Sequence, residues 1–458
     1  MTALWTSAEI AAATGGTAHG DFTCDSVTFD SREVIGGELF VAMRGEATDG
    51  HRFVPQAVER GAAGCVVSEA IETPHVLVDD GLAALEALGR AARERADATV
   101  IGVTGSVGKT SVKEALKLAL GECEPTATHV SVKSYNNHTG VPLSLARMPA
   151  ATRYGVFEMG MNHAGELSAL TRLVRPHIAI VTWIASAHRE FFDSEEGIAD
   201  AKGEIFEGLE AGPNGPATAV LPLASRHYSR LRAKAEQHAD RILTFGEEEG
   251  ADVRLVRHAE VDDGTVMIVD VCGTDVGFTL RQPGAHWRAN ALAVLAVCAA
   301  AGADLAAAAL GLGQMGGLAG RGAQHVVAWD GGDVRLIDES YNANDASMRA
   351  ALKVLRAAPT TGRRLVILGA IGELGTESER IHLELADPIA ASGAAQVLLV
   401  GADMAPLAER IDADFMADAD GAEDWLRGKM KAGDTVLIKG SNYHGLSRLV
   451  EAFAGTAA

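Results

Sequence analysis

From residue 97 onward, the chain alternates short apolar runs with amphipathic helical segments, and this alternation limits the possible folds more than any other feature. Runs such as TVIGVTG, RYGVFEMG and HIAIVTWIA are each followed by a segment with helical periodicity. The pattern restarts near residue 315 with VRLIDES and returns as late as DTVLIKGS. Apolar strands that alternate with helices predict parallel sheets covered by helices on both faces.

Breaks in this alternation predict three domains in a chain of 458 residues. We expect an N-terminal α/β domain at 1–96, a central parallel-sheet domain at 97–314 and a C-terminal, Rossmann-like α/β domain at 315–458. A strand-rich stretch at 241–284 is expected to hang off the central sheet. The glycine-rich segment 311–325 is expected to be the second linker.

The charge balance argues against several classes of partner. A formal net charge of −21 opposes non-specific binding to nucleic acid or to an anionic membrane surface. The chain starts without a basic region followed by an apolar core, and its apolar runs fall short of the roughly 20 residues of a membrane span. Five widely spaced cysteines without a C-x-x-C pair predict neither a disulfide framework nor a zinc site. We expect a monomeric cytoplasmic protein with no nucleic-acid partner and no membrane insertion.

The stretch GVTGSVGKT, 102–110, has the features of a phosphate-binding loop between a strand and a helix. Gly105 and Gly108 let backbone N–H groups turn toward phosphate oxygens, and the start of the helix adds partial positive charge. Lys109 can reach the terminal phosphates, and the Thr110 hydroxyl can bind Mg²⁺. The predicted nucleotide-binding residues here are Thr104, Gly105, Ser106, Val107, Gly108, Lys109 and Thr110. The alternative is an ordinary glycine-rich turn with a surface lysine.

Two further polar residues follow the next strands of the predicted sheet. Glu158 ends one apolar run, and His188 comes shortly after another. Ligands of open parallel sheets gather at the carboxyl ends of the strands, so both side chains could face the phosphate loop. A carboxylate and an imidazole beside phosphates suit Mg²⁺ or Mn²⁺, although either residue alone is more often structural.

The loop is unusual because its first glycine stands at 105, whereas the common pattern has it at 103. In this form, TGSVGKT resembles the loop of the Mur ligase superfamily, which also includes folylpolyglutamate synthetase. The resemblance implies ATP as the nucleotide, one or two Mg²⁺ ions and the formation of an amide bond.

The same resemblance changes the interpretation of Lys202 in SEEGIADAKGEIFEGL. Periodicity alone favours a solvated helix lysine. In Mur ligases a lysine in an A-K-x-E setting is carbamylated by CO₂ and helps to hold a second metal, and Lys202 and Glu204 match that setting. The metal ligands implied are Thr110, Glu158, His188 and carbamylated Lys202, and the catalytic residues implied are Lys109, Lys202, His188 and Arg321.

Two N-terminal motifs resemble the uridine-nucleotide domain of later Mur ligases. The segment FDSREV carries D-S-R, and a second turn reads D-G-H. An Asx-type turn is the alternative for D-S-R. The segment SYNNHTG, 134–140, resembles the family loop that touches nucleotide and sugar phosphates. The residues implied for the UDP-linked substrate are Ser31, Arg32, Asp49, His51, Asn136 and Asn137.

The C-terminal half carries the most specific motif, DESYNANDASM, 338–348. It is similar to D-x-Y-N-A-N-P-x-S-M of the members that add D-alanyl-D-alanine, although Asp345 replaces the proline; the alternative is an Asn-rich turn before a capped helix. The D-N-P-R pattern of the diaminopimelate- or lysine-adding members is absent. Asp338 ends an apolar run, so we expect it at the end of a strand, where it can bind the ribose hydroxyls of ATP. Tyr341, Asn342 and Asn344 can hydrogen-bond the incoming dipeptide.

An adenine-contacting motif is only partly kept. The family usually has H-N-x-x-N, and here His286 and Asn290 are present while Trp287 replaces the first asparagine. Asn290 is therefore the implied ATP contact in this motif.

Together these motifs imply an ATP-dependent ligase that joins UDP-N-acetylmuramoyl-tripeptide to D-alanyl-D-alanine through an acyl phosphate, in peptidoglycan precursor synthesis. The C-terminal domain is expected to close over ATP about a hinge in 311–325. The alternatives are a sister Mur or folylpolyglutamate-type ligase that adds another amino acid, or a non-catalytic nucleotide-binding subunit on the same fold. The form of the loop makes a general P-loop kinase or GTPase the weakest alternative.

Overall fold

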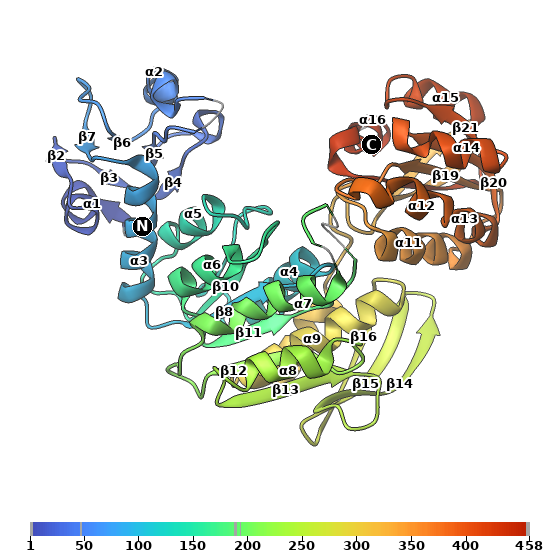
Figure 1. Ribbon diagram of the computed structural model, residues 1–458, viewed down its shortest axis with the longest axis horizontal. Coiled ribbons are helices and arrows are strands. Elements are labelled where there is room, and N and C mark those ends of the chain that lie inside the picture. The colour runs from blue at the N-terminus through green and yellow to red at the C-terminus, as the bar shows by residue number, and fades with distance from the viewer. Residues whose placement is uncertain (1–2, 46–47, 187–189, 193, 455–458) are drawn as a thin grey trace.

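A computed structural model describes residues 3–45, 48–186, 190–192 and 194–454. They form three units, each with its own main sheet, and the N-terminal and C-terminal units stand apart on the same side of the central one (Figure 1). The predicted three-domain α/β fold class is confirmed. No helix within these described ranges is long and apolar enough to cross a membrane.

The N-terminal unit has a five-stranded sheet in the order β2-β7-β6-β5-β4, in which β2 alone is antiparallel to its neighbour. Its main-sheet strands are β2 (Thr17–His19), β4 (Ser26–Thr28), β5 (Glu38–Val41), β6 (Gly64–Val67) and β7 (His75–Leu77). Two short strands, β1 (Trp5–Thr6) and β3 (Thr23–Cys24), pair beside it. Its helices are α1 (Ser7–Thr14), α2 (Val54–Glu59), α3 (Gly81–Arg95) and the 3₁₀ turns η1 (Ser31–Glu33) and η2 (Gly50–Phe53).

The central unit is built on a nine-stranded sheet in the order β16-β15-β14-β13-β12-β11-β8-β10-β9. Its parallel part contains β8 (Thr99–Thr104), β9 (Thr128–Val130), β10 (Tyr154–Glu158), β11 (Ile178–Val181), β12 (Thr218–Pro222) and β13 (Arg241–Gly246). One face packs against α4 (Lys109–Cys123), α9 (Ala285–Ala300) and α10 (Leu305–Gly313). The other face packs against α5 (Gly140–Ala146), α6 (Glu166–Val174), α7 (Glu195–Gly203) and α8 (Tyr228–Ala235).

The strand-rich stretch 241–284 does not hang off the sheet as expected; it is part of it. β13 pairs in parallel with β12, and β14 (Val253–Val261) pairs in parallel with β13. The antiparallel strands β15 (Gly264–Val271) and β16 (Thr274–Leu280) then extend the edge. Alternate side chains of β15 and β16 enter the same core as α9, which explains why these strands remain attached.

The C-terminal unit has a six-stranded sheet in the order β17-β18-β22-β19-β20-β21, in which only β17 is antiparallel to its neighbour. The strands are β17 (Ala323–Trp329), β18 (Gly332–Glu339), β19 (Arg364–Gly369), β20 (Ala394–Val400), β21 (Asp414–Met416) and β22 (Thr435–Lys439). The helices α11 (Asp345–Ala357), α12 (Ser378–Leu383), α13 (Ala386–Ser392) and α14 (Ala405–Arg410) are associated with one face. The helices α15 (Ala422–Lys429) and α16 (Ser447–Ala454) cover the other.

Candidate active site

The predicted phosphate loop connects the end of β8 to the start of α4. Gly105 has φ 154° and Gly108 has φ 86°, values that favour glycine. A Cβ on Gly105 would lie 2.0 Å from Oγ1 of Thr182, so no side chain fits there. The Thr182 hydroxyl donates to the carbonyl of Val107 at 2.5 Å. The end of β11 therefore braces the loop, a contact that the sequence motif did not indicate.

Two buried amines belong to this site. Lys109 Nζ donates to the carbonyl of Gly105 at 2.7 Å. Burial lowers the pKa of Lys109, the Glu158 carboxylate opposes this shift, and Arg321 adds to it. Lys202 on α7 is fully buried, and its Nζ has no hydrogen-bond partner among the described residues. Burial, together with repulsion from Lys109, lowers the pKa of Lys202 far below its usual value.

Glu158 lies at the end of β10, and only one of its two carboxylate oxygens accepts a side-chain hydrogen bond among the described residues. Asn136 Nδ2 donates to Oε1 at 2.8 Å, whereas Oε2 is buried without a partner in the part of the chain that the structure describes. Thr110 lies at the start of α4, and its hydroxyl is 3.5 Å from the hydroxyl of Ser134. Glu158 and Thr110 line the same cavity, and an unpaired buried carboxylate oxygen there suits a hard cation such as Mg²⁺. His188, the fourth predicted ligand, lies outside the described residues.

Local capping positions α7, which carries Lys202. The side chain of Ser194 accepts from the N–H of Gly197 and caps the start of the helix. Burial alone would raise the pKa of Glu195, but hydrogen bonds from Arg226, Ser186 and His227 lower it to about 2. Glu204 accepts from the N–H groups at the start of α6 instead of pairing with Lys202.

A cavity of about 940 Å³ separates the phosphate loop from the C-terminal unit. Both units line it. The predicted residues that it brings together are Ser106, Val107, Gly108, Lys109, Thr110, Asn136, Glu158, Asn290, Arg321, Tyr341, Asn342 and Asn344. The predicted residues that do not line it are Thr104, Gly105, Lys202, Asp338 and Asn137, together with the four N-terminal residues Ser31, Arg32, Asp49 and His51.

The linker and the YNAN segment pack directly on each other. The Arg321 guanidinium lies 4.2 Å from the centroid of the Tyr341 ring, close enough for a cation–π contact. Both carboxylate oxygens of Asp338 are already used, because Oδ2 accepts from the N–H of Gly320 at 2.6 Å and Oδ1 accepts from Ser340. Asp338 therefore holds the linker turn, and it is the next residue, Glu339, that lines the cavity.

The start of α9 reaches the phosphate loop from the other side. A Cβ on Gly108 would lie 2.9 Å from Oδ1 of Asn290, so this amide sits against the loop. Trp287, which replaces the expected asparagine, is 3% exposed and belongs to the core under the sheet. Burial, with the charge of Lys439 as a second cause, lowers the pKa of His286 to about 4.

Comparisons with known proteins match all three units of the chain to one family. Residues 23–104 match a family model described as "Mur ligase family, catalytic domain", 103–298 match "Mur ligase middle domain", and 324–442 match "Mur ligase, glutamate ligase domain". The chain belongs to the Mur ligase family. It is a ligase, and its family resemblance predicted from the sequence is confirmed.

Several relatives of this Mur ligase extend over nearly its full length. A UDP-N-acetylmuramoyl-tripeptide–D-alanyl-D-alanine ligase of Rickettsia prowazekii is 31% identical over 98% of this chain and 99% of its own. A solved UDP-N-acetylmuramoylalanyl-D-glutamyl-2,6-diaminopimelate–D-alanyl-D-alanyl ligase of Acinetobacter baumannii superposes with a TM-score of 0.83 at 29% identity, over 98% of both chains. The MurF ligase of Thermotoga maritima, solved in complex with ADP, has a TM-score of 0.75 at 26% identity over 94% of this chain and 97% of that chain. This Mur ligase accordingly uses ATP.

Among the cavity residues of this Mur ligase that were not predicted, two form an ion pair across neighbouring strands. Glu339 ends β18, and Lys439 ends the neighbouring strand β22, 3.6 Å from the Glu339 carboxylate. Burial lowers the pKa of Lys439 and raises that of Glu339, and each charge opposes the shift of the other. Lys439 Nζ also donates to the carbonyl of Asn342 at 3.0 Å. The stretch IKGS contained this signal, because its lysine ends an apolar strand.

The N-terminal motifs of the Mur ligase form local hydrogen-bonded turns. Ser31 Oγ donates to Gln56 at 2.7 Å, while the Arg32 side chain is 82% exposed and pairs with Asp30. His51 Nε2 accepts from the N–H of Ser68 at 2.9 Å, so its Nδ1 proton faces Asp49 at 2.7 Å. Hydrogen bonds from the His51 backbone and ring lower the pKa of Asp49.

Proposed function

We propose that this protein joins D-alanyl-D-alanine to UDP-N-acetylmuramoyl-tripeptide at the expense of ATP, in the synthesis of peptidoglycan precursor. The observation that carries the proposal is that one cavity is lined by both the phosphate loop and the Tyr341–Asn344 segment. A ligase that activates one carboxylate and transfers it to a second substrate needs both substrates in one water-poor space. The names of the full-length relatives support the same pair of substrates.

Each unit has a separate part in this proposal. Residues 1–96 hold the UDP-linked substrate through Ser31, Arg32, Asp49 and His51, with Asn136 and Asn137 of the central unit. Residues 97–314 hold ATP on the phosphate loop. Residues 315–458 hold D-alanyl-D-alanine near Tyr341, Asn342 and Asn344 and close on the nucleotide.

In the first step the carboxylate of the tripeptide attacks the γ-phosphate of ATP, and an acyl phosphate forms as ADP leaves. Two negatively charged groups must approach each other, so the loop N–H groups, Lys109 and Arg321 neutralise charge at this point. Glu158, Thr110, His188 and a carbamate on Lys202 would hold one or two Mg²⁺ ions, which supply further neutralisation when bound. The dipeptide amine then attacks the acyl carbon, and phosphate leaves.

The carbamate fits the environment of Lys202. Only a neutral amine adds CO₂, forming an N–C bond and releasing one proton. A fully buried amine whose pKa is lowered far below its usual value supplies that neutral form. Nζ has no hydrogen-bond partner among the described residues, so the carbamate would form without breaking a hydrogen bond of the amine.

Closure about the linker completes the site in this proposal. The linker runs between the end of α10 at Gly313 and the start of β17 at Ala323, inside the 311–325 hinge candidate. Interdomain distances measured by small-angle scattering should shorten when nucleotide and both substrates are added. Equal distances with and without them would contradict the hinge. We also propose a cytoplasmic, monomeric enzyme.

The decisive experiment measures phosphate release with ATP, Mg²⁺ and UDP-N-acetylmuramoyl-tripeptide, comparing D-alanyl-D-alanine, single amino acids and no acceptor. Release that requires the dipeptide, with a product of the matching pentapeptide mass, supports the proposal. Turnover only with another amino acid would move the protein to a sister ligase activity. Nucleotide binding without any turnover would favour a non-catalytic subunit.

A further inference from the structure

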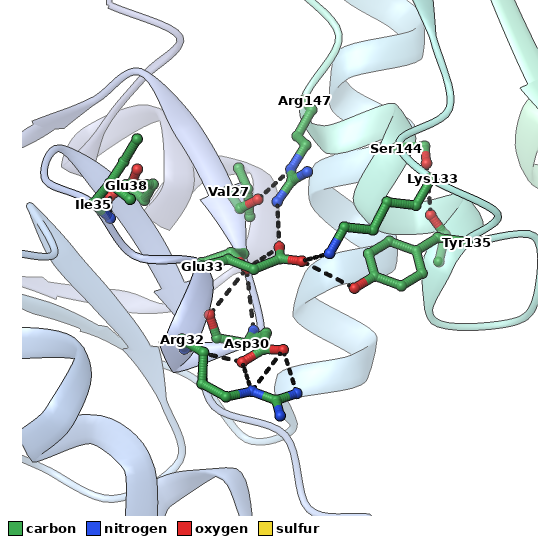
Figure 2. A network of polar contacts seen from close by, with 12 residues as sticks. Val27, Asp30, Arg32, Glu33, Ile35, Glu38, Lys133, Tyr135, Ser144 and Arg147 are labelled. Atoms are coloured by element: carbon green, nitrogen blue, oxygen red, sulfur yellow. Dashed lines mark hydrogen bonds and ion pairs between the residues drawn. The ribbon is translucent and has the colours of Figure 1, made fainter. Parts of the chain in front are cut away.

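Glu33 lies where the N-terminal unit meets the central unit, and its carboxylate collects hydrogen-bond donors from both (Figure 2). Oε1 accepts from Lys133 Nζ at 2.5 Å and from the Tyr135 hydroxyl at 3.1 Å. Oε2 accepts from the Thr28 hydroxyl at 3.2 Å and from Arg147 at 3.5 Å. Glu33 is the last residue of the 3₁₀ turn η1, which begins with Ser31 and Arg32. A ligand that moved this turn would therefore also move the backbone of Glu33.

The segment 131–136 receives the contacts of Glu33 and continues into the active site. Lys133 has φ 52°, a left-handed conformation that is unfavourable for a residue with a side chain. From α4, Lys113 Nζ donates to the carbonyls of Ser131 at 3.1 Å and Lys133 at 2.5 Å. The strained backbone is therefore held between a carboxylate of the N-terminal unit and a buried lysine of the phosphate-loop helix.

The same segment fixes Glu158 at its other side. Asn136 Nδ2 donates to Glu158 Oε1 at 2.8 Å, and its backbone carbonyl accepts from the N–H of Gly160 at 2.7 Å. Ser131 Oγ accepts from the N–H of Glu158 at 3.0 Å. Any shift of segment 131–136 would thus move both the main chain and the carboxylate of Glu158.

We infer that Glu33 is a positioning residue that sets the orientation of the Glu158 carboxylate through segment 131–136. The inference rests on the proposed function for the role of Glu158 toward metal-bound nucleotide. It assigns to the N-terminal unit a second task besides holding its substrate, because the turn that carries Ser31 and Arg32 also carries Glu33. Partners of metal ligands commonly change metal affinity when they are removed.

The test compares the affinity of ADP with Mg²⁺ and with EDTA, measured by titration calorimetry. In Glu33→Gln we expect the gain in ADP affinity that Mg²⁺ provides to fall about threefold to tenfold, with the affinity in EDTA unchanged within about twofold. The matched control is Glu86→Gln, which neutralises a carboxylate that pairs with Arg90 on α3 of the same unit at 3.4 Å. This control should keep the full Mg²⁺ gain.

A second variant, Tyr135→Phe, removes only the hydroxyl while keeping the ring beside Phe29. It should lower the Mg²⁺ gain less than Glu33→Gln, and the two changes together should be less than additive because they share one contact. A thermal unfolding measurement on each variant serves to check that it is folded.

Three results would overturn the inference: a full Mg²⁺ gain in Glu33→Gln, an equal loss in Mg²⁺ and in EDTA, or no Mg²⁺ gain in the unmodified protein. The titrations contain neither acceptor nor UDP-linked substrate. A failure to turn over D-alanyl-D-alanine would therefore refute the proposed function, while the Mg²⁺ gain still decides the role of Glu33.

Discussion

The side-chain amide of Asn136 donates a 2.8 Å hydrogen bond to one carboxylate oxygen of Glu158, and the other oxygen of Glu158 is buried without a partner among the described residues. This pairing orients the free oxygen without neutralising the carboxylate. A carboxylate arranged in this way is prepared for a cation, because a buried acceptor otherwise loses its hydration without compensation.

Asn136→Ala should therefore weaken activity by its effect on the metal. We expect about a tenfold to hundredfold loss of ATP-dependent phosphate release at low Mg²⁺, partly recovered at high Mg²⁺, because Glu158 loses the donor that orients it. A Mg²⁺ titration of the initial rate measures this. The control is Asn214→Ala. Asn214 Nδ2 donates a hydrogen bond of the same 2.8 Å length to the hydroxyl of Thr99, at the end of β8 that is farther from the phosphate loop. If both variants respond identically to Mg²⁺, the assignment is wrong.

Lys202→Met should separate stability from activity. Lys202 is fully buried, and its amine has no hydrogen-bond partner in the described part of the chain. Removing such an amine should raise the free energy of unfolding by about 1–3 kcal/mol in CO₂-depleted buffer, whereas activity should disappear. Urea unfolding and phosphate release measure the two effects. A destabilised variant would show that Lys202 makes structural contacts, and an active one would exclude a catalytic carbamate.

The lowered pKa of Lys202 also predicts how the effect of Lys202→Met on stability depends on pH. The folded pKa is depressed, so the unfolded chain binds a proton that the native protein does not bind. Stability is fully present above the usual lysine pKa of 10.5 and is lost as the pH falls toward the folded value. The advantage of Lys202→Met over the unmodified protein should accordingly be larger at neutral than at strongly alkaline pH.

The sequence predicted the fold class and the phosphate loop because both depend on local signals. Alternating apolar runs and helices define a parallel sheet, and a strand followed by G-K-T defines the loop. Contacts between distant segments have no such signal. Glu33 and Lys133 are 100 residues apart, and Glu339 meets Lys439 only because β18 and β22 are neighbours in the sheet.

Asp338 illustrates a second limit. Its place near the end of an apolar strand correctly indicated the end of the sheet, but successive strand residues face opposite sides. The carboxylate that lines the cavity belongs to Glu339, while Asp338 binds the linker turn at Gly320. A strand end therefore locates a site to within one residue, and the side that each residue faces must come from the structure.

Gly105→Ala should abolish nucleotide binding. The added Cβ would lie 2.0 Å from Oγ1 of Thr182 at a φ of 154°, so the loop must open to accept it. Gly121→Ala is the matched control, because it lies in α4 with no atom within 4 Å of the added Cβ. That control should bind ADP normally and gain about 0.5–1 kcal/mol of stability from the better helix propensity. Calorimetric ADP binding by Gly105→Ala would contradict the loop assignment.

His177 should make the stability of the protein depend on pH in the mildly acidic range. Burial, reinforced by the Arg93 guanidinium, lowers the pKa of His177 to about 4, compared with 6.5 for an ordinary histidine. Between these values the unfolded chain binds a proton that the native protein does not, so stability is present above 6.5 and is lost as the pH falls toward 4.

His177→Asn keeps an acceptor for the N–H of Val100, which donates to His177 Nδ1 at 3.1 Å. We expect the loss of unfolding free energy on acidification to be smaller in this variant by about 1–3 kcal/mol, measured by urea unfolding near neutral pH and at mildly acidic pH. His238→Asn, at an exposed position, should lose as much as the unmodified protein. An equal loss in all three proteins would show that His177 does not bring about the acid sensitivity.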